Sequence, residues 1–170
     1  MKHAHFLSTL LFCAVASACP GAHADNFQEL VIPNFEAEGP ACHVRLAVKA
    51  EKCVDQSCTF AAAKGASVEP VELRFTCFPA SAPTGFENPA PYAKIKSIQT
   101  KSAKGAVSII DDINTPAAVR QQELNFCLYG TKSNLCGSAK VAKIHGKESP
   151  TLGQIVALIK RIEWDEAAQK

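Results

Sequence analysis

The cysteines constrain the fold of this chain more strongly than any other residue type. Eight cysteines occur among its 170 residues, and two of them, Cys13 and Cys19, lie in the N-terminal segment. An even number of cysteines in an exported domain is typical of a disulfide framework, because the periplasm and the extracellular space oxidise thiols. We therefore expect the remaining six to be paired with one another: Cys42, Cys53, Cys58, Cys77, Cys127 and Cys136.

The first 24 residues have the pattern of a secretory signal peptide. Lys2 provides a positive charge before an apolar run over residues 6–18, and Ala22 and Ala24 have the small side chains that a signal peptidase reads. The run is too short to span a bilayer as a helix. Cleavage after Ala24 leaves a single domain over residues 25–170 and lowers the formal net charge from +2 to +1, since Lys2 is the only charged residue removed. This predicts a periplasmic or secreted protein.

A second interpretation of the same segment is lipidation at Cys19. Small residues, Ala16, Ser17 and Ala18, precede this cysteine as they do in a lipoprotein signal. The usual leucine before them is missing, and Pro20 follows. The protein would be attached to a membrane only if Cys19 carried a lipid.

Side-chain alternation narrows the possible disulfide pairings. Cys42 shares one face of a candidate strand with Val44 and Leu46, and Cys77 shares a face of another with Leu73 and Phe75. If these strands are antiparallel neighbours, a Cys42–Cys77 disulfide can form. Cys53–Cys58 would then close the turn between the strands, and Cys127–Cys136 would close a later hairpin. A reversed pairing of the first four cysteines is the alternative.

The cysteine spacing does not favour a metal site or a redox site. A structural zinc site usually shows C-x₂-C pairs, and a thioredoxin-like site needs C-x-x-C at the start of a helix. The chain contains neither spacing, and the two cysteines of the segment KCVDQSC are separated by four residues. We expect no cofactor and no bound metal.

The pattern of apolar residues predicts an α+β fold. Strands are expected over residues 27–32, 43–50 and 68–78, two more within 92–110, and a hairpin of 122–130 with 139–144. A helix is expected to begin at Ser149 and Pro150, because apolar residues then recur at steps of three and four up to Ile162. The expected architecture is an antiparallel sheet of about five to seven strands, stapled by disulfides, with one C-terminal helix packed on a face. A β-sandwich is the alternative.

Two surfaces are candidates for binding a partner. Residues 79–91 hold four of the ten prolines and include Phe86; so long a loop is often functional. Tyr92, Lys94 and Lys96 follow, and with Phe86 they form the candidate binding surface. The lysines indicate either a small basic patch for an anionic partner or an edge strand protected against pairing, and the second interpretation is favoured. No aromatic residues alternate with the lysines, so nucleic acid is not expected.

Catalysis has little support in the sequence. His43 and His145 are the only histidines after residue 24, and no nucleophile elbow, metalloprotease helix or phosphate-binding loop occurs. Asp111 and Asp112 are expected to be turn residues. We expect an exported, non-catalytic binding or accessory module whose partner is another envelope or extracellular protein or a small ligand. An envelope lipoprotein subunit anchored through Cys19 and a hydrolase-type enzyme using His43 or His145 are the alternatives.

Overall fold

The chain folds into two antiparallel β-sheets and one helix. The computed structural model describes residues 27–36, 39–61, 70–116, 119–142 and 150–164. In chain order the elements are β1 (Gln28–Ile32), β2 (Cys42–Leu46), β3 (Lys52–Val54), β4 (Ser57–Phe60), β5 (Val71–Pro79), β6 (Lys94–Gln99), β7 (Lys104–Asp111), β8 (Gln121–Tyr129), β9 (Ser133–Ala142), α1 (Pro150–Lys160) and β10 (Ile162–Trp164). The architecture is α+β, as the sequence predicts.

The larger sheet has seven strands in the order β3-β4-β5-β9-β8-β7-β6. Each strand is antiparallel to its neighbours. Side chains alternate between its two faces, so that Leu73 and Phe75 of β5 and Leu124 and Phe126 of β8 are buried on one of them. We call this the inner face. Arg74 of β5 and Asn125 of β8 belong to the opposite, outer face.

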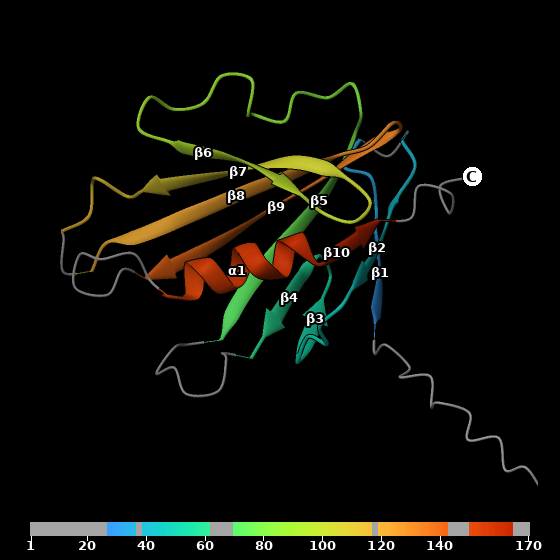
Figure 1. Ribbon diagram of the computed structural model, residues 1–170, viewed down its shortest axis with the longest axis horizontal. Helices are drawn as coiled ribbons and strands as arrows, with labels where there is room; N and C mark the ends of the chain where they lie inside the picture. The colour runs from blue at the N-terminus through green and yellow to red at the C-terminus, as the bar shows by residue number, and fades with distance from the viewer. Residues whose placement is uncertain (1–26, 37–38, 62–69, 117–118, 143–149, 165–170) are drawn as a thin grey trace, which may run out of the picture.

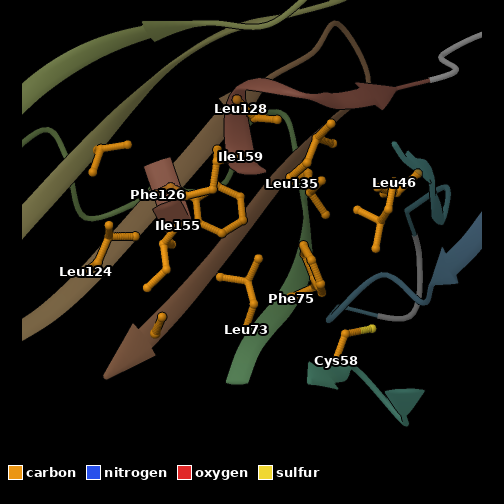
Figure 2. Packing of buried hydrophobic residues seen from close by; sticks show 14 of the residues in the cluster. Leu46, Cys58, Leu73, Phe75, Leu124, Phe126, Leu128, Leu135, Ile155 and Ile159 are labelled. Carbon is orange, nitrogen blue, oxygen red and sulfur yellow. The ribbon is translucent and has the colours of Figure 1, made fainter. Parts of the chain in front are cut away.

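Helix α1 and the smaller sheet share one hydrophobic core with the inner face. The helix overlaps β5 and the end of β9 in Figure 1, and its Ile155 and Ile159 lie near Phe126 in Figure 2. Both isoleucines are almost completely buried, which follows from their spacing along one helical face. The smaller sheet has the order β1-β2-β10, and its Leu46 belongs to the same core. No helix of the described residues has the length and apolarity that a membrane crossing requires.

The three disulfides have the pairing favoured by the sequence: Cys42–Cys77, Cys53–Cys58 and Cys127–Cys136. Cys42 and Cys77 are both fully buried, in agreement with their expected inward positions. The expectation that their strands are neighbours in one sheet is wrong. Strand β2 pairs with β1 and β10, whereas β5 pairs with β4 and β9. The Cys42–Cys77 bond therefore joins the two sheets.

The segment KCVDQSC is a hairpin of its own rather than a turn between β2 and β5. Cys53 of β3 and Cys58 of β4 lie directly opposite each other in the antiparallel register. The turn between them places Asp55 at a φ of 53°, a left-handed conformation that aspartate tolerates better than most residues. The strand expected over 43–50 also ends earlier, at Leu46, because the chain bends there toward the β3–β4 hairpin.

The C-terminal expectations agree with the structure where they can be compared. Helix α1 begins at Pro150, whose fixed φ suits the first turn. The proposed cap, Ser149, lies outside the described residues. Trp164 ends the short strand β10, where it lies opposite Val44 of β2. The helix and β10 thus close the core from the C-terminal end.

Candidate functional site

A cavity lies between the outer face of the large sheet and the loop over residues 79–91. Its volume is about 320 Å³. Loop residues Thr84, Phe86 and Pro89 line one side. The other side is the outer face of strands β5 to β9, with Ile95 of β6 at the margin; we call this space the outer-face cavity. The proline-rich loop that the sequence marks as a candidate binding surface therefore forms part of its wall.

A row of three small polar side chains crosses the sheet side of this cavity. Ser108 of β7 lies opposite Asn125 of β8, which in turn lies opposite Ser138 of β9. All three line the cavity. Their side chains form no hydrogen bond with any residue that the structure describes. We call them the polar row; their hydroxyl and amide groups are available to a ligand as donors and acceptors.

Apolar groups surround the polar row. Phe78 of β5, Phe86 of the loop, Ile95 of β6 and Ile110 of β7 line the cavity. The Cys127–Cys136 disulfide also lines it, because the two cysteines lie opposite each other on the outer face of β8 and β9. Of the described residues that line the cavity, none carries a formal charge. This combination suits an uncharged ligand, because an ion would lose hydration without gaining a counter-charge.

The loop above the cavity is held by short-range hydrogen bonds. Glu87 accepts hydrogen bonds from the Thr84 backbone N–H at 3.1 Å and from the Thr84 hydroxyl at 2.9 Å. Its own backbone N–H, followed by the two Thr84 groups, holds the pKa of Glu87 below its ordinary value. Gly85 between them has a φ of 81°, which favours glycine. The base of the loop is fixed where the Ala80 N–H donates to the Lys132 carbonyl at 3.0 Å.

Charged side chains of the outer face lie beyond the cavity and partner one another. Arg74 forms an ion pair with Glu72 at 3.2 Å, and Ser57 donates to the same carboxylate at 2.6 Å. The Ser57 hydroxyl and then Arg74 keep the pKa of Glu72 below its usual value. These two charges compensate each other at the surface, so the cavity stays neutral.

The structure separates the four residues of the candidate binding surface. Phe86 lines the outer-face cavity, whereas Tyr92 is 55 % exposed and does not line it. Lys94 and Lys96 lie opposite Ile109 and Val107 in the register, on the helix side of the sheet. Phe86 and the two lysines therefore lie on opposite sides of strand β6. The interpretation of β6 as an edge strand agrees with the strand order.

Sequence reasoning missed the polar row. Ser108, Asn125 and Ser138 come from three strands, and each occupies the outward position between two inward neighbours. The signal in the sequence is a small polar residue at an outward-facing position in each of three strands whose inward-facing residues are mostly apolar. It becomes visible only when the strand order and register are known, because the three residues are far apart in the chain.

Of the remaining candidate residues, those that the structure describes lie on different elements. His43 lies on β2 in the smaller sheet and forms no side-chain hydrogen bond with a described residue; His145 lies outside the described residues. Asp111 accepts a hydrogen bond from Gln122 at 2.9 Å. Asp112 accepts hydrogen bonds from the Thr115 hydroxyl and the Asn114 N–H, as expected of a turn residue. The described residues contain no group of three or more His, Cys, Asp or Glu arranged to hold a metal ion.

Comparisons with known proteins do not assign the chain to a family. No protein-family model, no curated protein sequence and no solved structure matched it. The three intramolecular disulfides are consistent with an oxidising extracellular or periplasmic location. The fold, the disulfides and the outer-face cavity are therefore the observations on which a function can be argued.

Proposed function

We propose that the protein is an exported, non-catalytic binding module that holds an uncharged ligand, or an uncharged group of a partner protein, in the outer-face cavity. The observation that carries this proposal is the polar row. Three polar side chains line one apolar-walled cavity without hydrogen-bond partners among the described residues. Such groups can exchange their hydrogen bonds with water for hydrogen bonds with a ligand, while the apolar walls add buried contact area.

The size and chemistry of the cavity support a small binding group. Ligand sites typically have volumes of about 300–1,000 Å³ and combine apolar walls with a few oriented polar groups. At about 320 Å³ the outer-face cavity lies at the lower end of that range. Phe78 and Phe86 offer aromatic surface, while Asn125 offers both a donor and an acceptor. A neutral ligand with an apolar part and at least one polar group fits this lining.

Export is supported by two independent features of the chain. The first 24 residues have the signal-peptide pattern, and the disulfides need an oxidising compartment to form and persist. Export by this route predicts a mature N-terminus at Asp25. Intact-mass measurement of the protein from its native host distinguishes this form from a lipid-modified form beginning at Cys19, the form that an envelope lipoprotein subunit would have.

A hydrolase role receives less support. A general base must lie within hydrogen-bond reach of the group that it activates, and His43 has no such neighbour among the described residues. A cysteine nucleophile also needs a free thiol, yet all six cysteines after residue 24 are paired. Thiol titration of the denatured, unreduced mature protein tests this point and is expected to find no free cysteine.

The binding role is tested by substituting the polar row. Protein purified from its native host under mild conditions is analysed by native mass spectrometry for a bound mass. Asn125→Leu keeps the approximate size of the side chain but removes its hydrogen-bonding groups, so we expect the bound mass to be lost. Asn114→Leu is the matched control, because Asn114 lies in an exposed turn and does not line the cavity. Retention of the bound mass by Asn125→Leu, or equal loss in both variants, would contradict the proposal.

A further inference from the structure

Strand β6 forms one open edge of the seven-stranded sheet. Among the strands that the structure describes, it pairs only with β7, as the strand order shows and as Figure 1 illustrates. The Thr100 N–H donates to the Ala103 carbonyl at 2.9 Å, which makes this residue pair a hydrogen-bonded pair of the hairpin. Hydrogen-bonded and non-hydrogen-bonded pairs alternate along an antiparallel ladder. Residues 94, 96 and 98 therefore bond to β7, and the backbone groups of Ile95 and Ser97 point away from the sheet.

These outward backbone groups are free to pair with another strand. Neither Ile95 nor Ser97 forms a backbone hydrogen bond with a described residue outside the sheet. Ile95 is 41 % exposed, and Ser97 is exposed as well. Two donors and two acceptors thus lie along the accessible edge of an otherwise complete sheet. Such an edge can accept an extended peptide as an additional strand.

A groove lies beside the open edge of β6 and could receive side chains of an added strand. It lies between α1 and the inner side of β6 and β7, and its volume is about 250 Å³. Ile98 and Val107 form one wall, and Leu152 and Val156 of the helix form the other. Lys96 and Lys160 line it too. Within the described part of the chain, neither lysine forms an ion pair.

The charges select the kind of strand that can bind. We propose that β6 is a docking edge for an extended acidic peptide segment of a partner protein, with an acidic side chain between Lys96 and Lys160 and an apolar side chain beside Ile95. Charge complementarity carries this choice of occupant. An antiparallel second copy of β6 would bring the lysines of the two strands onto the same face, where like charges repel. The same lysines that oppose self-pairing therefore favour an acidic partner.

This proposal concerns a second surface, which shares only Ile95 with the margin of the outer-face cavity. Side chains of the added strand alternate between its two sides, so the strand can contact the lysines on one side of β6 and Ile95 on the other at the same time. One set of its side chains points to the helix side, toward Lys96, and the other set points to the outer side, toward Ile95. A strand that alternates acidic and apolar residues satisfies both sides in a single register.

The direct test uses a fluorescent peptide in which valine and glutamate alternate, titrated against the mature oxidised protein. We expect saturable binding that weakens as salt rises, and no binding of the same peptide with lysine in place of glutamate. Ser97→Pro removes an outward N–H that β7 does not use, and it should lower the affinity by about tenfold or more. Ser97→Val keeps that N–H and should bind as well as the unsubstituted protein.

Two further measurements separate strand addition from general charge attraction. Lys96→Gln should weaken binding by about threefold and reduce its salt dependence, whereas Lys52→Gln, on the opposite edge strand β3, should change neither. Bound peptide should slow amide hydrogen exchange at Ile95 and Ser97 more than at Lys96 and Ile98, whose N–H groups already bond to β7. Equal binding by Ser97→Pro with its fold intact, unchanged exchange at Ile95 and Ser97, or no binding of the acidic peptide would overturn the proposal. Phe86→Ala should not affect this peptide, which keeps the result distinct from that for the outer-face cavity.

Discussion

Removal of the Cys42–Cys77 disulfide is expected to cost more stability than removal of either other disulfide. The sequence separations are 35 residues for Cys42–Cys77 and 5 for Cys53–Cys58. In the chain-entropy model a disulfide stabilises by restricting the unfolded chain, and the gain grows with the logarithm of the loop length. This gives about 4 kcal/mol for the longer loop and about 2 kcal/mol for the shorter one.

The position of the Cys42–Cys77 disulfide in the fold also predicts where its removal loosens the structure. Cys42–Cys77 joins the smaller sheet to β5, whereas Cys53–Cys58 joins two strands that are already paired through their backbones. Without the first bond, the smaller sheet is held to the rest of the protein by core packing and by a few hydrogen bonds, such as those from the Phe35 N–H to the Cys77 carbonyl and from the Trp164 N–H to the Ser102 hydroxyl, each at 2.8 Å. Amide hydrogen exchange in β1 and β2 should therefore accelerate in Cys42→Ala/Cys77→Ala, while the central strands β8 and β9 stay protected.

The assay compares guanidinium unfolding of two double variants, Cys42→Ala/Cys77→Ala and Cys53→Ala/Cys58→Ala, which leave no unpaired thiol. For a domain of this size, a slope of about 4 kcal/mol per molar denaturant separates their midpoints by about 0.5 M. The first variant should have the lower midpoint. Equal midpoints, or a lower midpoint for the second variant, would refute the argument that loop length and the link between sheets determine the contribution of each bond.

Three other predictions concern two glycines and the turn after β7. Gly137→Ala should destabilise the protein by about 1–3 kcal/mol in denaturant unfolding, because a Cβ there would overlap the Arg74 carbonyl oxygen and the Phe126 ring. Gly153→Ala, in helix α1 with no atom near the added Cβ, should instead stabilise it by about 0.5–1 kcal/mol, and a stability loss in this variant would contradict the prediction. The Thr115 hydroxyl holds the pKa of Asp112 below its ordinary value, so the folded state binds this proton less readily than the unfolded chain. The stabilisation by Asp112 is thus complete above the unfolded pKa of about 3.9 and is lost as the pH falls through the lower folded pKa. Asp112→Ala should be less stable than the unsubstituted protein at neutral pH and equal to it in strong acid, and a carboxyl titration midpoint at or above the ordinary value in NMR would refute the assignment.

Local patterns in the sequence predict the individual elements well, for a physical reason. Alternation of apolar and polar residues specifies which side of a strand is buried, so Cys42 and Cys77 are correctly assigned to the interior and to each other. The three- and four-residue spacing of Leu152, Ile155 and Ile159 likewise specifies the buried face of α1. These features depend on residues that are close in the chain, which is why the pattern alone is sufficient.

The arrangement of the strands depends on contacts that the pattern does not contain. The alternation of β2 is equally compatible with pairing to β5 or to β1, and β10 completes the smaller sheet from the far end of the chain. The outer-face cavity also depends on contacts between residues that are distant in the chain. Its polar row exists only because β7, β8 and β9 are in one register, and Phe86 reaches it through a loop whose course no periodicity describes.

The most direct test of the proposed function is site-specific photo-cross-linking at the outer-face cavity. A photoreactive phenylalanine analogue is placed at Phe86, which lines the cavity, and in a second protein at Tyr92, which is exposed near the end of the same loop but outside the cavity. Both proteins are irradiated in the native host, and the products are identified by mass spectrometry. We expect a discrete adduct from position 86 that is absent from position 92 and that disappears with Asn125→Leu. No adduct from position 86, or the same products from both positions, would contradict the assignment of the cavity as the binding site.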